Sequence, residues 1–197
     1  MSKILTIKKK IGKFNKIIKV SGDKSLSIRW ILLASQSSGK SRAYNLLMSE
    51  DVLSAIDSIK KLGIKVKIQK NYCEILGNGI NGFKYKKNLT IDAKNSGTLG
   101  RLILGLLIKS PYKIKLIGDE SLSKRDFSRV TKPLEKFGAK FYFEKKNKLP
   151  LSIIGSKLPK SINYLENKGS AQCKSSVMLA ALISSGTTLI KAKKSRN

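Results

Sequence analysis

An internal repeat of about 75 residues limits the folds open to this chain more than any other feature. Three segments each contain a polar turn with a serine, an apolar helical run, a short break and a β-prone run. The turn serines are Ser25, Ser96 and Ser170, which lie 71 and 74 residues apart. Because a repeated unit buries its apolar face against its neighbours, we expect the units to share one core.

The segments between these turns repeat as well. Residues 49–68 and 122–143 each predict an amphipathic helix that stops at a glycine, Gly63 or Gly138, before a strand. A further short strand closes each unit. Pro133 falls within the second helix and predicts a late helix start or a kink. The predicted unit is therefore strand, helix, strand, helix, strand, strand (βαβαββ).

This pattern predicts an α/β (α+β) fold with units at residues 20–90, 91–163 and 164–197. The apolar run at 16–20 is expected to supply the strand before the first helix. The third unit stops midway, which would leave sheet edges and a helix face without partners. We therefore expect a truncated form, the front part of a longer protein. A complete domain with an unusual end is the less favoured alternative.

Each serine turn opens a helix, and such a turn suits an anion. Free backbone N–H groups, partial positive charge and a hydroxyl meet there. Cations flank the three turns in pairs: Lys24 and Arg29, Lys94 and Arg101, Lys168 and Lys174. Capped helix starts without a ligand are the alternative. The threefold repetition favours a site for a ligand with several phosphate or carboxylate groups.

The charge of the chain admits two interpretations. Lysine and arginine number 41 against 12 acidic residues, a formal net charge of +29. Nucleic-acid binding is one reading of such a charge. However, the lysines are spread along the whole chain, arginines are few, and the aromatic residues lie in apolar runs. We therefore favour a compositional bias with a small anionic substrate, and we expect no nucleic-acid partner.

Several functional classes are disfavoured by what the sequence contains. There is no histidine, and Cys73 and Cys173 show no metal-ligand spacing, so we expect no metal and no Ser–His or Cys–His catalysis. No apolar run is long enough for a membrane span, and no signal peptide is recognisable. These features predict a cytoplasmic protein with no membrane partner.

Residues 34–41 (ASQSSGKS) come close to a nucleotide-binding P-loop. Ala34 replaces the first glycine of that pattern, and the repeat places the stretch after a helix. A P-loop instead lies between a strand and the helix that follows. We therefore do not expect a nucleotide site here.

Four motifs resemble the 3-phosphoshikimate 1-carboxyvinyltransferase (EPSP synthase) family. They are GDKSLSIRWILLA, DAKNSGTLGRLILGLL, GDESLSKRDFSRVTKPLEKFGA and GSAQCKSSVMLAAL, and they follow the family order between about Val20 and Asn197. The resemblance implies an enolpyruvyl transferase-like fold with helices packed inside small sheets. Residues 20–197 would form an enolpyruvyl transferase domain of about two and a half units. Residues 1–19 would be a strand segment that packs with a second domain absent from this chain.

The resemblance also implies a reaction. The enolpyruvyl group of phosphoenolpyruvate passes to the 5-hydroxyl of shikimate 3-phosphate, through a tetrahedral intermediate that then loses phosphate. This is a step of the shikimate pathway to chorismate, and it needs no cofactor. The family's general-base aspartate lies in the half absent here, so the chain alone is expected to be inactive, whereas the full-length enzyme would be a monomer.

Two alternatives stay open beside this reaction. The related transferase acting on UDP-N-acetylglucosamine typically has Lys-Asn where this chain has Lys24-Ser25. It also has a reactive cysteine in a mobile loop, which neither Cys73 nor Cys173 matches. The other alternative is a non-catalytic basic domain that binds nucleic acid.

Matched to the family motifs, Lys24 would contact both substrates as the catalytic lysine. The residues implied for shikimate 3-phosphate are Ser25, Arg29, Ser170, Ala171 and Gln172. Gly97 and Arg125 would bind phosphoenolpyruvate, with Asn95 shaping the loop. Ser195 and Arg196 lie where the family continues toward another substrate contact. Ser96 and Gly100 depart from the family's common Ala and Met but leave Gly97 and Thr98 intact.

Overall fold

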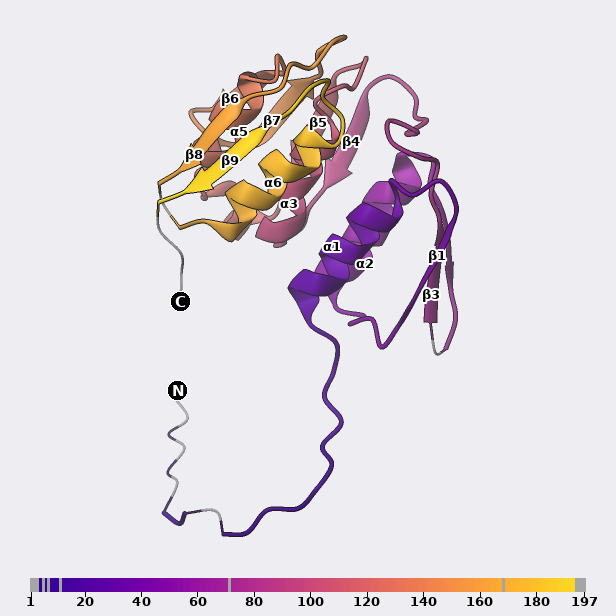
Figure 1. Ribbon diagram of the computed structural model, residues 1–197, viewed down its shortest axis with the longest axis vertical. Helices are drawn as coiled ribbons and strands as arrows, with labels where there is room; N and C mark the ends of the chain where they lie inside the picture. Colours follow the sequence, from indigo (N-terminus) through magenta and orange to yellow (C-terminus); the bar gives the residue numbers. More distant parts are fainter. Residues whose placement is uncertain are drawn as a thin grey trace.

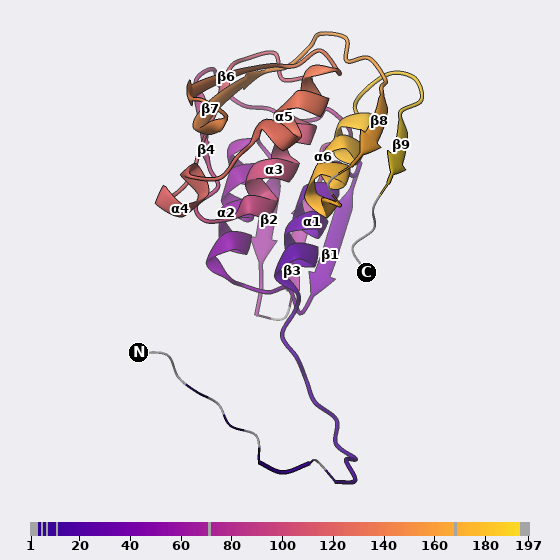
Figure 2. The same ribbon diagram turned by 90° about the vertical axis from the view of Figure 1, so that its left-hand side faces the viewer.

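Three small sheets surround a group of helices in the computed structural model (Figures 1 and 2). The structure describes residues 4, 6, 8–10, 12–70, 72–167 and 169–193. The three sheets follow one another along the chain, and the helices lie on the inner side of the sheets. The predicted class, an α/β fold of repeated units with helices inside small sheets, is confirmed.

The first unit has a three-stranded sheet. Its elements are α1 (Lys24–Ala34), β1 (Lys40–Tyr44), α2 (Glu50–Lys61), β2 (Lys65–Ile68) and β3 (Tyr72–Leu76). The strand order is β1-β3-β2, and both pairs are antiparallel. Gly63 follows α2 with φ +86°, and a Cβ there would lie 2.4 Å from the Lys84 carbonyl oxygen, so only glycine fits. The ASQSSGKS stretch joins α1 to β1, a helix-to-strand order unlike that of a P-loop.

The second unit repeats this order with one more strand in its sheet. Its elements are β4 (Leu89–Asp92), α3 (Gly97–Leu106), β5 (Ile114–Ile117), α4 (Glu120–Ser123), α5 (Ser128–Glu135), β6 (Lys140–Lys145) and β7 (Lys148–Ile154). The strand order is β4-β5-β7-β6, with β4 and β5 parallel. The expected helix around Pro133 is divided into α4 and α5. The predicted late start is confirmed, because α5 begins only at Ser128 and contains Pro133.

The third unit contributes β8 (Asn163–Glu166), α6 (Ala171–Ala181) and β9 (Leu189–Ala192). Strands β8 and β9 pair in parallel, as β4 and β5 do in the second unit. The same strand–helix–strand arrangement therefore occurs twice, and the predicted repeat is confirmed there.

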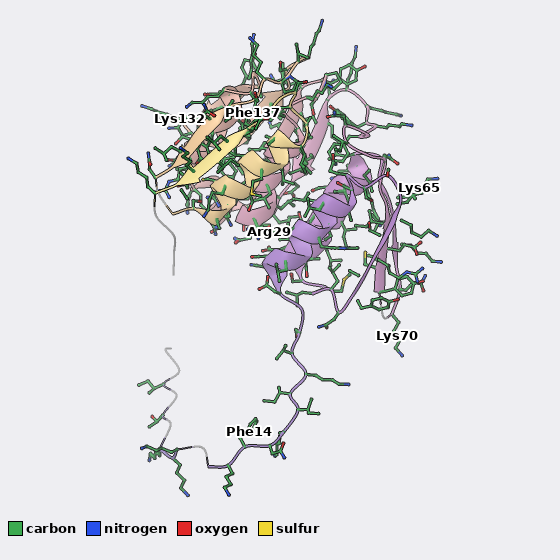
Figure 3. All side chains as sticks on the ribbon, in the orientation of Figure 1. Phe14, Arg29, Lys65, Lys70, Lys132 and Phe137 are labelled. Atoms are coloured by element: carbon green, nitrogen blue, oxygen red, sulfur yellow. The ribbon has the colours of Figure 1, made fainter. Side chains whose placement is uncertain are left out.

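The prediction of a strand at residues 16–20 is wrong. In the described part of this segment the chain is an irregular extended arm that leads away from the helices, and Figure 3 shows Phe14 on it. Ile17 is 98% exposed. By analogy with β4 and β8, this run should pair in parallel with β1, but no such ladder forms among the described residues. Without a ladder, the backbone groups remain open to solvent. The expected packing of residues 1–19 against another domain stays a prediction.

Helix α3 lies at the centre of the fold, and all of its residues except Arg101 are buried. It packs closely against α6, because a Cβ on Gly105 would lie 2.2 Å from the Ser176 carbonyl oxygen. The Ser176 hydroxyl donates to the Arg101 carbonyl at 2.9 Å. These contacts hold the two helices side by side. No helix in the described ranges is long and apolar enough to cross a membrane.

Candidate functional site

A cavity of about 610 Å³ opens where the N-terminal ends of α1 and α6 meet α3. Its lining is rich in arginine and contains one carboxylate. The lining residues are Ser25, Arg29, Arg101, Asp126, Arg129, Ser170, Ala171, Gln172 and Cys173. The structure thus brings together Ser25, Arg29, Ser170, Ala171 and Gln172 from two units, but not Lys24, which the family motifs imply for both substrates. Figure 3 shows Arg29 between α1 and the neighbouring helices.

The three serine turns are not geometrically equivalent, which corrects the sequence prediction. Ser96 and Ser170 are the N-caps of α3 and α6, accepting from the backbone N–H of Leu99 and of Cys173. At α1 the N-cap is Asp23, whose carboxylate accepts from Leu26 N–H at 2.7 Å. Aspartate and serine are comparable N-caps, and a carboxylate adds a favourable interaction with the helix dipole. Ser25 therefore lies within the first turn of α1 and lines the cavity instead.

Arg101 links α3 to the start of α6. Its Nη1 donates to Gln172 Oε1 at 2.7 Å, and Gln172 Nε2 donates to Thr98 Oγ1 at 3.1 Å. The guanidinium also lies over the Phe127 ring, 5.3 Å from its centroid. Burial lowers the pKa of Arg101, and the positive charges of Arg125 and Arg129 act in the same direction. An anion in the cavity would relieve this repulsion.

A cluster of polar side chains lies beside the cavity, around Gly97. A Cβ at Gly97 would stand 2.8 Å from Arg101 Nη1 and 3.0 Å from Arg125 Nη1, so two guanidinium groups cover this glycine. Arg125 Nη2 donates to Asn95 Oδ1 at 3.4 Å, and Asn95 Nδ2 donates to Asp119 Oδ2 at 2.6 Å. The three residues implied for phosphoenolpyruvate, Asn95, Gly97 and Arg125, therefore form one cluster beside the cavity.

Lysines contribute less to the cavity than the sequence suggested. Lys24 is exposed, does not line the cavity, and pairs with Asp51 of α2 at 2.8 Å. Lys94 pairs with Asp92 at 2.9 Å, and this hydrogen bond raises the pKa of Lys94. Lys168, Ser195 and Arg196 lie outside the described residues. The catalytic role of Lys24 stays a prediction.

Sequence reasoning named Arg101 only as a cation that flanks the second turn, and it left Asp126, Arg129 and Cys173 out of the site. Arg129 lies in the first turn of α5, where a cation is unfavourable for the helix dipole, and this position could have indicated a functional role. The thiols of Cys73 and Cys173 are free and buried, and burial raises the pKa of both. No group of three or more Cys, Asp or Glu side chains that could hold a metal occurs in the part of the chain that the structure describes.

Replacing Asp119 with alanine should lower the melting temperature by a few degrees at pH 7, because α4 loses its N-cap and Asn95 loses its partner. Hydrogen bonds from Leu122 N–H and then from Asn95 hold the pKa of Asp119 below its ordinary value. A depressed carboxylate pKa stabilises the fold above the unfolded-state pKa of about 3.9 and loses that contribution as the pH falls. Thermal unfolding from pH 7 to pH 3 should therefore show the difference shrinking below about pH 4; a constant difference would contradict the assignment.

Fold and cavity together define a class: a repeat-built α/β protein with an arginine-rich cavity. Comparison with known proteins makes this class specific. The family model described as EPSP synthase (3-phosphoshikimate 1-carboxyvinyltransferase) matches residues 8–196. The chain belongs to the EPSP synthase family.

Individual relatives agree with this assignment. The chain is 40% identical over 182 residues to the 3-phosphoshikimate 1-carboxyvinyltransferase of Streptococcus mutans, covering 91% of this chain and 42% of the relative. It is 38% identical over 192 residues to that of Streptococcus pyogenes, covering 97% of this chain and 44% of the relative. EPSP synthase from Acinetobacter baumannii superimposes with a TM-score of 0.85 at 32% identity, covering 91% and 41% of the two chains. The chain thus spans less than half the length of these relatives.

Proposed function

We propose that this chain forms part of an enzyme that transfers the enolpyruvyl group of phosphoenolpyruvate to the 5-hydroxyl of shikimate 3-phosphate. The cavity that gathers Ser25, Arg29, Ser170, Ala171 and Gln172 carries the proposal. Arginine forks and helix N-terminal N–H groups match a phosphate, while a serine hydroxyl can donate or accept. Membership of the EPSP synthase family supplies the reaction.

The cluster beside the cavity suits the second substrate. Arg125 and Arg101 present guanidinium groups over Gly97, where no side chain intervenes. Phosphoenolpyruvate carries a phosphate and a carboxylate, and preorganised cations would stabilise the charge that develops during addition and elimination. Lys24 is proposed to contact both substrates, which requires it to leave Asp51 when they bind.

We further propose that the enzyme acts in the cytoplasm as a monomer without nucleic acid. The way in which the lysines are distributed supports the absence of a nucleic-acid partner. Lys65, Lys70 and Lys132 project from the outer surface in Figure 3, apart from Arg29. A charge dispersed in this way differs from the basic patch or stripe that marks a nucleic-acid interface.

Isothermal titration calorimetry of the 197-residue chain with shikimate 3-phosphate tests the proposal. We expect saturable binding in the millimolar range or tighter, and shikimate without its phosphate should bind at least about tenfold more weakly, since charge-assisted hydrogen bonds are lost. Absence of heat at millimolar ligand would count against the site. Salt-dependent binding to arbitrary single-stranded DNA that shikimate 3-phosphate does not displace would favour a basic binding domain instead.

A further inference from the structure

The Gln172 side-chain amide lies between two fixed groups of α3. Its carbonyl oxygen accepts from Arg101 Nη1, and its nitrogen donates to Thr98 Oγ1. Thr98 is buried and Arg101 is partly buried, so neither partner is a freely rotating surface group. Gln172 itself lines the 610 Å³ cavity. The amide therefore has one N–H engaged and one left for a ligand.

The two partners differ in what they can specify. A threonine hydroxyl both donates and accepts, so Thr98 tolerates either orientation of the amide. A guanidinium has donors only, so a flipped amide would place its NH₂ against Arg101 Nη1, donor against donor. Arg101 alone thus decides which end of the amide lies against Arg101 and which lies against Thr98.

Arg101 is held firmly enough for this task. Its guanidinium contacts the Gly97 carbonyl at 3.4 Å, one turn back on α3, and lies over the Phe127 ring. Its backbone carbonyl accepts from Ser176 of α6, so the same residue joins the two helices at a second point. Its position is therefore fixed by contacts from three elements.

We propose that Arg101 is a positioning residue that locks the Gln172 amide with Oε1 on Arg101 and Nε2 on Thr98, so that the second N–H of Nε2 is available to the anionic ligand. With the amide flipped, Oε1 would take the place of Nε2 beside Thr98, and its partial negative charge would repel an anion that the N–H would otherwise bind. The consequence for shikimate 3-phosphate rests on the proposed function, whereas the orientation of the amide does not.

Side-chain amide hydrogen exchange, measured by NMR on the ¹⁵N-labelled chain without ligand, tests the orientation. The chain has only three glutamines, Gln36, Gln69 and Gln172, and exposed Gln69 serves as an internal free reference. We expect the Gln172 N–H bonded to Thr98 to exchange about tenfold more slowly than Gln69. Arg101→Met should abolish this slowing, since the amide then samples both orientations. Arg101→Lys, which keeps a donor-only head group, should retain most of it.

Arg129→Met is the matched control, because it removes a cation from the same cavity lining without touching the amide. It should leave the exchange of Gln172 unchanged. Unaltered exchange in Arg101→Met, or an equal change in Arg129→Met, would overturn the proposal. Where Arg101→Met does not fold, Arg101→Gln replaces it, since a glutamine matches either orientation and should also abolish the slowing.

Calorimetry with shikimate 3-phosphate then separates the two claims. The affinity should fall about tenfold in Arg101→Met, which loses the oriented donor, and only about threefold or less in Arg101→Lys. Slowed exchange without any binding to the unaltered chain would refute the proposed function and leave the positioning role intact. Binding of shikimate 3-phosphate without slowed exchange of Gln172 would refute the positioning role and leave the proposed function intact.

Discussion

The Arg29→Met variant should bind shikimate 3-phosphate on the order of 50-fold more weakly than the unaltered chain. Arg29 lines the cavity, and its contact with its own helix is a long bond of 3.2 Å from Nη1 to the Ser25 carbonyl. Most of its donors are therefore free for a phosphate, and each charge-assisted hydrogen bond is worth about 1.5–3 kcal/mol. Methionine keeps the stem in the adjoining apolar groove beside Leu33 and Met178, so the fold should survive.

Arg42→Met provides the matched control for this loss. Arg42 lies on the sheet of the first unit, pairs with Glu74 at 2.7 Å and covers the Tyr72 ring. It removes the same charge without touching the cavity, so the calorimetric affinity should stay the same. An equal loss in both variants would mean that the ligand responds to net charge alone. An unchanged affinity in Arg29→Met would exclude Arg29 from the site.

Elements whose signal is local were predictable from the sequence. The glycines that end helices, Gly63 and Gly138, adopt positive φ as the pattern requires, and Pro133 restricts α5 to a late start. The run at 16–20 shows the limit of such reasoning. Its residues favour a strand, but a strand exists only when a neighbour accepts its hydrogen bonds, and that neighbour is not encoded in the run itself.

The site also contains residues that a local motif predicts and contacts that only the folded structure reveals. Ser170, Ala171 and Gln172 follow from one motif at the start of α6, and Asn95 and Gly97 follow from another at α3. The bond between Arg101 and Gln172 joins residues 71 positions apart. It depends on the close approach of α3 and α6 at Gly105, which no local pattern reveals. The repeated serines predicted Ser25 at the start of α1, whereas the N-cap is Asp23, two residues earlier.

Gly97→Ala should weaken phosphoenolpyruvate binding, and inhibition by its mimic glyphosate, by about tenfold or more. The added Cβ would stand within 2.8 Å of Arg101 Nη1 and 3.0 Å of Arg125 Nη1. Both atoms lie at the far ends of long side chains, so each guanidinium group can shift by the few tenths of an ångström that the methyl group requires, and the protein should still fold. Their displacement removes charge-assisted contacts with the anion, each worth about tenfold or more in affinity. Shikimate 3-phosphate should be affected less, because Arg29 and Ser170 remain in place.

Gly100→Ala in the same helix isolates the effect of position. Its Cβ would meet Ala93, Phe127 and Leu122 at 3.4 to 3.6 Å, which is ordinary van der Waals contact, and alanine favours the helix over glycine. The KM for phosphoenolpyruvate can be measured in a chimera joining this chain to the remainder of the Streptococcus mutans relative. Equal losses in the two variants would trace the effect to packing of α3. A loss confined to Gly97→Ala would trace it to the two arginines, because their guanidinium atoms are what the new methyl group meets first.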